Sequence, residues 1–386
     1  MTYLKQDISL PGMGPGIAPR LVTHTFGNPH SGKSAYIQAG LHGDEHPGLL
    51  VIQHLLVLLK ALDQQGAIAG CVTLVPYANP IGMAQRVFGP IVGRFDFENG
   101  ENFNRNYPTL SDAVREQVNS GKGAGMTARD WKAFFQEQLD AQQPPRHVTG
   151  AMKLELSRLA MAHDVVLDLH CDTDAIAHLY ASRLQSARAC KLANQIGAPV
   201  VLVEEPESGG YSGGNSFDQM HANAWSVLVE AGLFTPETAG FATTVELRGQ
   251  IDISDELAQN DAEAILDFLA QEGVLSQEAA TGKPRPHGAA QVYPLEAASH
   301  IPCPCSGVVV YLKEPGQQVL KGETIAEIVT IDGDQFNERV PIVSDVDGVL
   351  VVRQLHRLVR NGQRAAFVAG HALQPGQRSS KLVLDF

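Results

Sequence analysis

The sequence predicts an α/β fold, with a mixed, mostly parallel sheet covered by helices on both faces, followed by a smaller all-β domain. Between residue 20 and about residue 270, short β-branched runs alternate with longer segments whose apolar residues recur at helical spacing. The short runs are apolar almost throughout, which is typical of strands buried on both faces of a sheet. A chain of 386 residues is too long for one ordinary hydrophobic core. We therefore expect two domains, at residues 1–285 and 286–386.

The strands and helices of the first domain follow from local patterns. Short β-branched runs bounded by turn residues predict strands at 34–40, 70–76, 164–170, 198–204 and 242–248. Longer apolar-periodic segments predict helices at 48–62, 151–162, 185–196 and 254–271. The polar segment 109–150 interrupts this alternation, and we interpret it as an insertion, partly helical over 128–141, that folds over one edge of a site.

The second domain begins after a Pro/Gly-rich linker at 281–288 and has no helical periodicity. It contains two similar halves, 306–329 and 347–370, each with a glycine, a valine-rich run, a turn and another apolar run. These halves resemble the two half-motifs of the biotinyl/lipoyl barrel-sandwich fold. Such carrier domains present a modified lysine on the hairpin between the halves, whereas 330–340 contains no lysine here. We therefore expect an all-β barrel-sandwich domain without a carrier role.

The composition excludes several classes of partner. A net charge of −13 argues against nucleic-acid and anionic-membrane surfaces, which need clustered Lys and Arg. The first residues lack the basic segment and apolar run of a signal peptide, and the apolar segment 48–62 is short and interrupted by polar residues. Five scattered cysteines suit a reducing compartment. These features predict a cytoplasmic protein with no membrane and no nucleic-acid partner, and they are compatible with a homo-oligomer.

Candidate metal ligands lie where predicted strands end. In the stretch GLHGDEHPG, His42 and Glu45 form an H-x-x-E on a tight turn between a strand and a helix, and Gly43 permits the sharp backbone. His170 ends a later apolar strand, at the sheet edge where α/β proteins bind ligands. Asp168 shares the face of His170, so its carboxylate is placed to orient the imidazole. By themselves these side chains are compatible with a metal site and also with a polar turn and a strand-end histidine bonded to solvent.

Two further groups suit hydrolytic chemistry. Glu246 follows a β-branched run at another strand end, where it is either a general base or the partner of Arg248 in an ion pair. The irregular loop 79–108 contains Asn104-Arg105, an amide next to a guanidinium that can bind a carboxylate. The same loop contains other arginines able to stabilise an oxyanion, at positions 86 and 94.

The ordered set of motifs resembles the succinylglutamate desuccinylase/aspartoacylase family of the zinc carboxypeptidase clan, over about residues 34–270. The lipoyl-like domain is similar to the domain appended in that family. The resemblance implies one zinc ion per chain, held by His42, Glu45 and His170. It also implies the following roles: Glu246 as general base, Asn104 and Arg105 as ligands of the substrate carboxylate, and Arg94, with Arg86 as the alternative, as the oxyanion group.

The resulting expectation is a cytoplasmic zinc amidohydrolase that removes a short acyl group from an N-acyl amino acid. The Gly-rich loop 209–214 lacks the Lys-Ser/Thr of a phosphate-binding loop, so we expect it to border the pocket, with Tyr211 contacting the substrate. A zinc carboxypeptidase acting on a peptide is the nearest alternative. A non-catalytic binding protein on the same fold is the alternative from another functional class.

Overall fold

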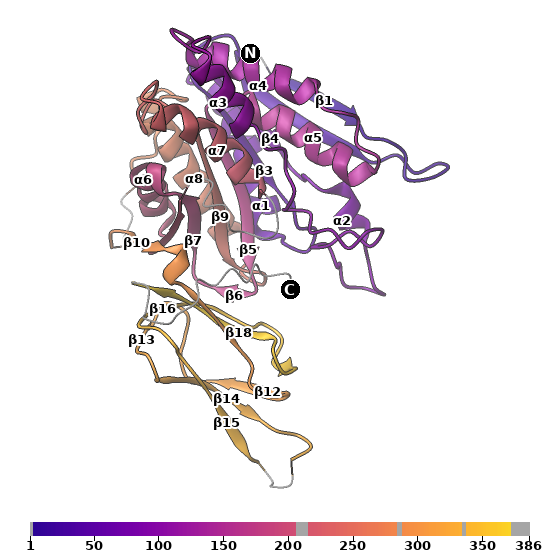
Figure 1. Cartoon of the computed structure of the whole chain (residues 1–386), viewed down its shortest axis with the longest axis vertical. Coiled ribbons are helices and arrows are strands. Elements are labelled where there is room, and N and C mark those ends of the chain that lie inside the picture. Colours follow the sequence, from indigo (N-terminus) through magenta and orange to yellow (C-terminus); the bar gives the residue numbers. More distant parts are fainter. Residues whose placement is uncertain (1–2, 206–214, 284–287, 334–336, 372–386) are drawn as a thin grey trace.

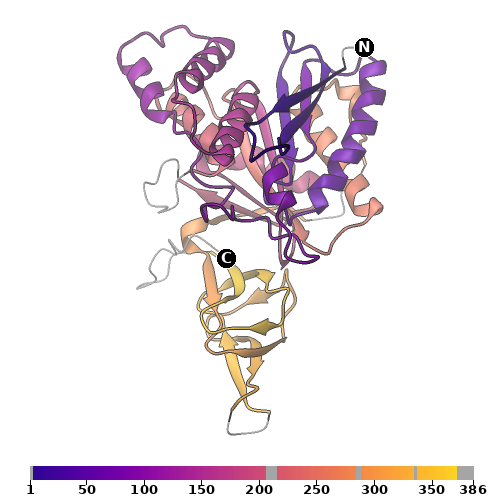
Figure 2. The same cartoon turned by 90° about the vertical axis from the view of Figure 1, so that its right-hand side faces the viewer.

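The computed structural model describes residues 3–205, 215–283, 288–333 and 337–371. A large α/β domain holds most of the chain, and a smaller β domain formed by the C-terminal residues lies below it (Figures 1 and 2). The α/β domain is built on a nine-stranded sheet, and the C-terminal domain is built on two antiparallel sheets. The predicted fold class is thus confirmed for the α/β part.

The nine-stranded sheet is mixed and mostly parallel, as predicted. In spatial order its strands are β1 (Leu4–Ser9), β2 (Arg20–Gly27), β4 (Cys71–Val75), β3 (Ser34–Ala39), β5 (Val165–Asp172), β9 (Phe241–Gly249), β7 (His178–Ser182), β8 (Val200–Glu204) and β10 (Gln291–Pro294). The central strands β4, β3, β5 and β9 are parallel neighbours. Their carboxyl ends therefore meet at one edge, where open α/β sheets bind ligands.

Helices cover both faces of this sheet because successive residues of its strands point apolar side chains to opposite faces. Along β3, Ala35 and Ile37 pack into one core and Tyr36 into the other. The first core is closed by α1 (Pro47–Gln64), α6 (Ser186–Ile196) and α8 (Asp255–Gln271). The second core is closed by α3 (Ser111–Asn119), α4 (Ala128–Asp140), α5 (Val148–Met161) and α7 (Phe217–Glu230). Short connecting helices are α2 (Pro80–Ala84), η1 (Arg183–Gln185), η2 (Gln277–Ala279) and η3 (Leu295–Ala297).

The segment predicted as an insertion contains α3 and α4. The predicted helix over 128–141 is confirmed, and the helix at 111–119 was not predicted. Trp131 and Phe135 of α4 are completely buried in the second core, together with Trp225 of α7. The segment therefore forms part of the cover on one sheet face.

Helix α1 accounts for the most apolar segment of the sequence. Among the described helices, α1 is the one long and apolar enough to cross a membrane by length and composition. Its residues Val51, Ile52, Leu55 and Leu59 are buried in the first core, against the sheet and α8. Packing inside the domain thus explains the apolar face of this helix.

The C-terminal domain confirms the internal repeat. Its strands are β11 (Ser299–Pro302), β12 (Gly307–Tyr311), β13 (Gln318–Val319), β14 (Thr324–Val329), β15 (Arg339–Val343), β16 (Gly348–Arg353), β17 (Leu358–Val359) and β18 (Arg364–Gly370). The first half places β12 beside β14, and the second half places β16 beside β18 in the other sheet. The short strands are exchanged, since β17 pairs with β12 and β13 with β16.

The two parts of the chain are joined in two ways. Strand β10 adds to the α/β sheet beside β8, so that sheet extends past residue 286, where we expected the second domain to begin. The two-residue strand β6 (Asp174–Ala175), which follows β5 directly, pairs with β16 of the C-terminal domain. The C-terminal domain therefore contacts the chain immediately after a central strand.

Candidate metal centre and active site

The loop between β3 and α1 is shaped by close backbone packing. Strand β3 ends at Ala39 and α1 begins at Pro47, so the loop reverses within a few residues. A Cβ on Gly43 would lie 2.6 Å from the carbonyl carbon of Gly82, so only glycine fits there. Gly43 N donates to Gly93 O at 2.9 Å. This contact fixes the loop against the segment 79–108 and directs its polar side chains toward the sheet edge.

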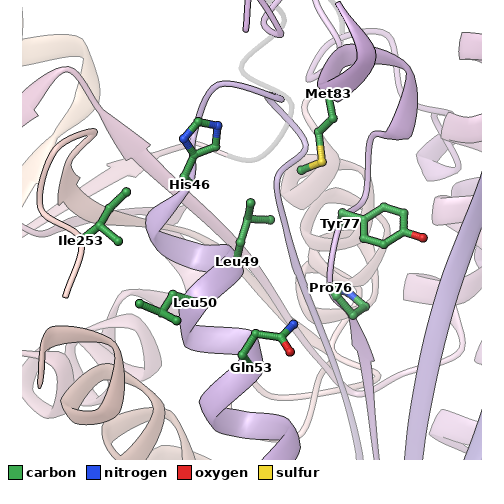
Figure 3. Close-up of a pocket in the computed structure, with 8 residues that line it drawn as sticks. All are labelled: His46, Leu49, Leu50, Gln53, Pro76, Tyr77, Met83 and Ile253. Carbon is green, nitrogen blue, oxygen red and sulfur yellow. The ribbon is translucent and has the colours of Figure 1, made fainter. Parts of the chain in front are cut away.

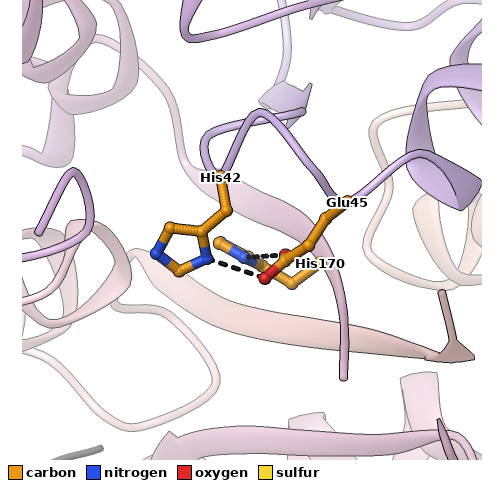
Figure 4. Close-up of side chains that lie close together, drawn as sticks. All are labelled: His42, Glu45 and His170. Atoms are coloured by element: carbon orange, nitrogen blue, oxygen red, sulfur yellow. Dashed lines mark hydrogen bonds and ion pairs between the residues drawn. The ribbon is translucent and has the colours of Figure 1, made fainter. Parts of the chain in front are cut away.

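The side chains of His42, Glu45 and His170 converge at that edge (Figure 4). His42 Nδ1 lies 2.8 Å from Glu45 Oε1, and His170 Nδ1 lies 2.7 Å from Glu45 Oε2. Each residue is at most 4% exposed, and one ligand atom from each lies within 4.8 Å of the others. Two imidazole nitrogens and a carboxylate are the donor set of a catalytic zinc site, so these residues fit the metal that the sequence implied.

Hydrogen bonds fix which nitrogen of His42 faces Glu45. Asn102 Oδ1 accepts a hydrogen bond from Asn104 N at 2.8 Å and lies 3.1 Å from His42 Nε2. Since the atom facing a backbone N–H must be the amide oxygen, His42 Nε2 must carry the proton and donate it. The lone pair of His42 is then on Nδ1, toward Glu45, which is the form that binds a metal.

The orientation of His170 is fixed by a buried chain of polar groups. His170 Nε2 lies 2.8 Å from Asp168 Oδ2, as the shared strand face predicted. Gln38 Nε2 donates to Asp168 Oδ1 at 2.9 Å, and the Tyr36 hydroxyl donates to Gln38 Oε1 at 2.8 Å. Because a carboxylate can only accept, His170 donates from Nε2 to Asp168 and from Nδ1 to Glu45 in the metal-free protein, and a metal would take the place of the Nδ1 proton.

The charges of this cluster are strongly coupled. Burial lowers the pKa of His170, but the carboxylates of Asp168 and Glu45 outweigh burial and hold that pKa well above its usual range. Burial raises the pKa of Glu45, but His42 and His170 outweigh it and hold that pKa well below its usual range. Burial and the nearby Arg94 lower the pKa of His42. Glu45 is therefore an anion between two imidazoles, a charge arrangement that suits a cation.

Glu246 lies beside His170, its register partner on β9. Burial and the negative charge of Glu45 raise the pKa of Glu246 to about 8. Among the described residues, none is hydrogen-bonded to its buried Oε2. The alternative interpretation, an ion pair with Arg248, is wrong, because Arg248 pairs with Asp261 of α8. A carboxyl group beside His170, with one oxygen that has no hydrogen-bond partner among the described residues, is suited to proton transfer.

The structure separates the two candidate oxyanion arginines. Arg94 Nη1 lies 3.2 Å from His42 Nδ1, and Arg94 Nη2 lies 3.6 Å from Glu45 Oε1. Arg86 is exposed and its Nη1 donates to Gly89 O at 3.0 Å. Arg86 pairs through its backbone with Ile91 across a turn, and that turn directs its side chain outward. The structure therefore brings Arg94 to the cluster and leaves Arg86 away from it.

The segment carrying Asn104 and Arg105 lies next to the cluster. Asn104 Oδ1 accepts from Phe217 N at 2.8 Å, so this oxygen holds the first turn of α7. Arg105 is half-buried, and its Nη1 donates to Asn104 O at 2.7 Å. The positive charge of Arg105 acts on Glu204 at the end of β8. The guanidinium of Arg105 therefore lies within electrostatic range of Glu204 at the end of β8.

The sequence did not single out the groups that hold this segment. Lys153 of α5 is buried, and its Nζ donates to Glu101 Oε1 at 2.5 Å and to Asn102 O at 3.1 Å. Asn102 itself was also missed, although it lies two residues before the predicted Asn104. Spacing within the motif was its only signal, since its contact with His42 spans 60 residues. The predicted contact residue Tyr211 lies outside the described residues.

An apolar groove of about 430 Å³ lies beside the first turns of α1 (Figure 3). None of the predicted zinc ligands lines it. Its only imidazole is that of His46, whose Nε2 lies 3.2 Å from Gly43 O. The groove is lined by His46, Leu49, Leu50, Gln53, Pro76, Tyr77, Met83 and Ile253.

Comparison with known proteins identifies a family for most of the α/β domain. The sequence model of the succinylglutamate desuccinylase/aspartoacylase catalytic domain matches residues 31–271. No curated protein matches the chain by sequence. The matched segment contains the ligand cluster, Glu246 and the arginine-bearing loop.

Several solved structures share the fold over nearly the whole chain. A succinylglutamate desuccinylase/aspartoacylase family protein from Shewanella amazonensis SB2B has a TM-score of 0.80 at 24% identity, covering 95% of this chain and 98% of its own. A similarly described protein from Shewanella frigidimarina NCIMB 400 has a TM-score of 0.80 at 23% identity, with 95% and 97% covered. The product-bound ectoine utilization protein EutE from Ruegeria pomeroyi has a TM-score of 0.66 at 15% identity, with 95% of each chain covered. At these identities the likeness shows the fold, including the C-terminal domain.

Proposed function

The chain belongs to the succinylglutamate desuccinylase/aspartoacylase family, and from that premise we propose that it is a zinc-dependent amidohydrolase that removes a short acyl group from an N-acyl amino acid. The observation that carries the proposal is the buried convergence of His42, Glu45 and His170 beside Glu246. The reaction is hydrolysis of an amide other than a peptide bond: water adds to the carbonyl carbon, the C–N bond breaks, and a carboxylate and an ammonium group form, with both water protons ending on the leaving nitrogen.

Three side chains would hold one zinc ion per chain: His42 and His170 through Nδ1, and Glu45 through its carboxylate. Zinc in such a site supplies Lewis-acid polarisation of a carbonyl oxygen and lowers the pKa of a water molecule toward neutrality. Asn102 and Asp168 keep both histidines in the protonation form that leaves Nδ1 free.

Glu246 is the proposed general base. Its Oε2 takes a proton from the attacking water and returns it to the nitrogen of the leaving amine, so that no net proton is consumed at the site. Burial and the charge of Glu45 raise the pKa of this carboxyl to about 8, which is close to neutral pH. A pKa near neutrality suits both taking up and returning the proton. Arg94 donates to the oxyanion that develops on the carbonyl oxygen, because its guanidinium already lies beside His42 and Glu45.

The proposed substrate is a small N-acyl amino acid whose free carboxylate binds Arg105. A guanidinium binds a planar carboxylate through two parallel hydrogen bonds, which fixes the orientation of the amide relative to Glu246. A zinc carboxypeptidase would use the same residues on the terminal carboxylate of a peptide. The two functions differ in what lies on the acyl side of the scissile bond.

A hydrolysis screen separates them. The zinc-loaded protein is assayed with N-acetyl and N-succinyl amino acids, with the same compounds carrying a blocked carboxylate, and with peptides of matching C-terminal residue. We expect turnover of the free-carboxylate N-acyl amino acids, and much slower turnover of the blocked forms and the peptides. Preferential release of C-terminal residues from the peptides would instead establish the carboxypeptidase.

The proposed place of action is the cytoplasm. Cys71, Cys171, Cys190, Cys303 and Cys305 are all free thiols, which suits a reducing compartment. The acidic composition gives no support for a nucleic-acid or anionic-membrane partner.

A further inference from the structure

The strand that carries His170 continues into a buried ion pair with the C-terminal domain. Two residues after His170, Asp172 ends β5, and its carboxylate is paired by both terminal nitrogens of Arg364. Arg364 Nη1 donates to Asp172 Oδ2 at 3.0 Å, and Nη2 donates to Asp172 Oδ1. Both residues are at most 9% exposed. Arg364 opens β18, so this counterion comes from the other domain.

The backbone after Asp172 is held on two sides. On one side the Thr173 hydroxyl donates to Arg353 O at 2.7 Å, and Ile176 N donates to Val351 O at 3.1 Å, both across the domain boundary. On the other side Gln250 N donates to Thr173 O at 3.1 Å, just beyond the end of β9. Figure 1 shows β6 at this boundary, between β5 and the sheet of β16 and β18.

The same segment is packed closely against the strand of Glu246. Asp172 is the register partner of Gly249, three residues after Glu246. A Cβ on Gly249 would lie 3.1 Å from Thr173 O and 3.2 Å from the Asp174 Cα, so the end of β9 and residues 173–174 are in backbone contact. A shift of residues 172–174 is therefore transmitted to both strand ends that carry the proposed site.

We propose that Arg364 is a positioning residue for the metal site, and that the C-terminal domain thereby completes the active centre of the catalytic domain. The inference rests on the proposed zinc site. Without Arg364, Asp172 would be a buried carboxylate without a counterion, so it would either take up a proton or regain solvation by moving the end of β5. Either response changes the contacts that hold residues 172–174. His170 lies on that strand end, and its Nδ1 must stay aligned with Glu45 to bind a metal. Arg364 acts on the site through the position of His170.

The test measures binding of cobalt(II) to the full, metal-free chain, because the visible absorption of bound cobalt reports the geometry of its ligands. The variant Arg364→Met removes the guanidinium and keeps much of the side-chain volume. The variant Arg364→Lys keeps the charge but cannot form two parallel hydrogen bonds. The matched control is Arg357→Met. Arg357 lies at the same domain boundary and pairs with Asp174 from a more exposed position, and Asp174 keeps its ion pair with Arg353 in this variant.

For Arg364→Met we expect cobalt affinity about tenfold weaker, as for other residues that orient metal ligands, together with an altered absorption spectrum. Arg364→Lys is expected to fall between this variant and the wild type, and Arg357→Met is expected to match the wild type. A folded Arg364→Met protein with wild-type affinity and spectrum overturns the inference. If that variant does not fold, Arg364→Lys decides by the same readouts. Wild-type protein that binds no cobalt overturns the zinc site itself.

Discussion

Replacing Asp168 by asparagine tests how the protein presents His170 to a metal. Asp168 is completely buried and accepts two hydrogen bonds, from Gln38 Nε2 at 2.9 Å and from His170 Nε2 at 2.8 Å. Asparagine has the same shape, but one of its terminal groups is an NH₂ that cannot accept. If the NH₂ faces His170, Nε2 must accept, so the imidazole carries its proton only on Nδ1, the atom that faces Glu45. If it faces Gln38, two NH₂ groups oppose each other in a buried position.

The expected size follows from these alternatives. Either arrangement disfavours the form of His170 that offers Nδ1 to the metal, while His42 and Glu45 are unchanged. Groups that orient a metal-bound histidine contribute about tenfold to hundredfold in metal affinity. At about 1.4 kcal/mol per factor of ten, this corresponds to about 1.4–2.8 kcal/mol of metal-binding free energy.

The assay is a competitive zinc titration of the metal-free variant against a chromophoric chelator, at constant pH. The matched control is Asp267→Asn. Asp267 lies in α8, is also buried, and accepts a hydrogen bond from the Thr281 hydroxyl at 2.8 Å. Both variants lose a buried acceptor, so both are expected to melt at a lower temperature. Only Asp168→Asn is expected to lose zinc affinity.

Equal zinc affinity in Asp168→Asn and in the wild type would refute this reasoning. It would mean that Asp168 stabilises the strand without controlling the protonation of His170. An equal loss of affinity in the Asp267 control would refute it as well, since the effect would then follow from stability alone.

Three other outcomes are expected. Glu246→Gln keeps zinc but loses about a hundredfold or more of turnover, as a lost general base does, and an unchanged rate would contradict its role. Arg94→Leu lowers kcat about a hundredfold, as the loss of an oxyanion donor does, whereas Arg86→Leu leaves kcat unchanged; the opposite pattern in steady-state assays would exchange their roles. Burial and Asp218 raise the pKa of Glu204 to about 7. The folded state therefore binds the Glu204 proton more tightly than the unfolded chain does, and the stability gained from this proton is lost as pH rises toward about 7. Glu204→Gln should therefore raise the Tm relative to wild type more at about pH 8 than at about pH 4.5, and an equal shift at both pH values in calorimetry would contradict this.

The elements that could be predicted from the sequence are those with a clear period. The central strands β3, β4 and β5 read as continuous apolar runs, and α1 and α8 have an apolar face. Helix α7 was missed because nearly all its residues are buried, including His221 and Asn223, so no polar face marks it. Strand β7 was missed because it is short and leads directly into η1.

The site divides in the same way. His42, Glu45 and His170 could be predicted as candidates because each lies near the end of a strand that the sequence itself marks. The residues that orient them, Asn102 and Gln38, could not, because their roles depend on contacts between distant segments. Arg364 is the extreme case, since its partner Asp172 lies 192 residues earlier in another domain. Pattern reasoning finds candidate ligands at strand ends, while the groups that orient them appear only after folding.

The most direct test of the central claim is a zinc titration of the metal-free protein, followed by the rate of hydrolysis of an N-acyl amino acid found in the screen. The account predicts negligible turnover without zinc, a linear rise to one equivalent of zinc per chain, and a plateau beyond it. The variant His170→Ala should show no such break at one equivalent. Full turnover by the metal-free protein, or a rise with no break at one equivalent, would contradict the claim that His42, Glu45 and His170 form a catalytic zinc site.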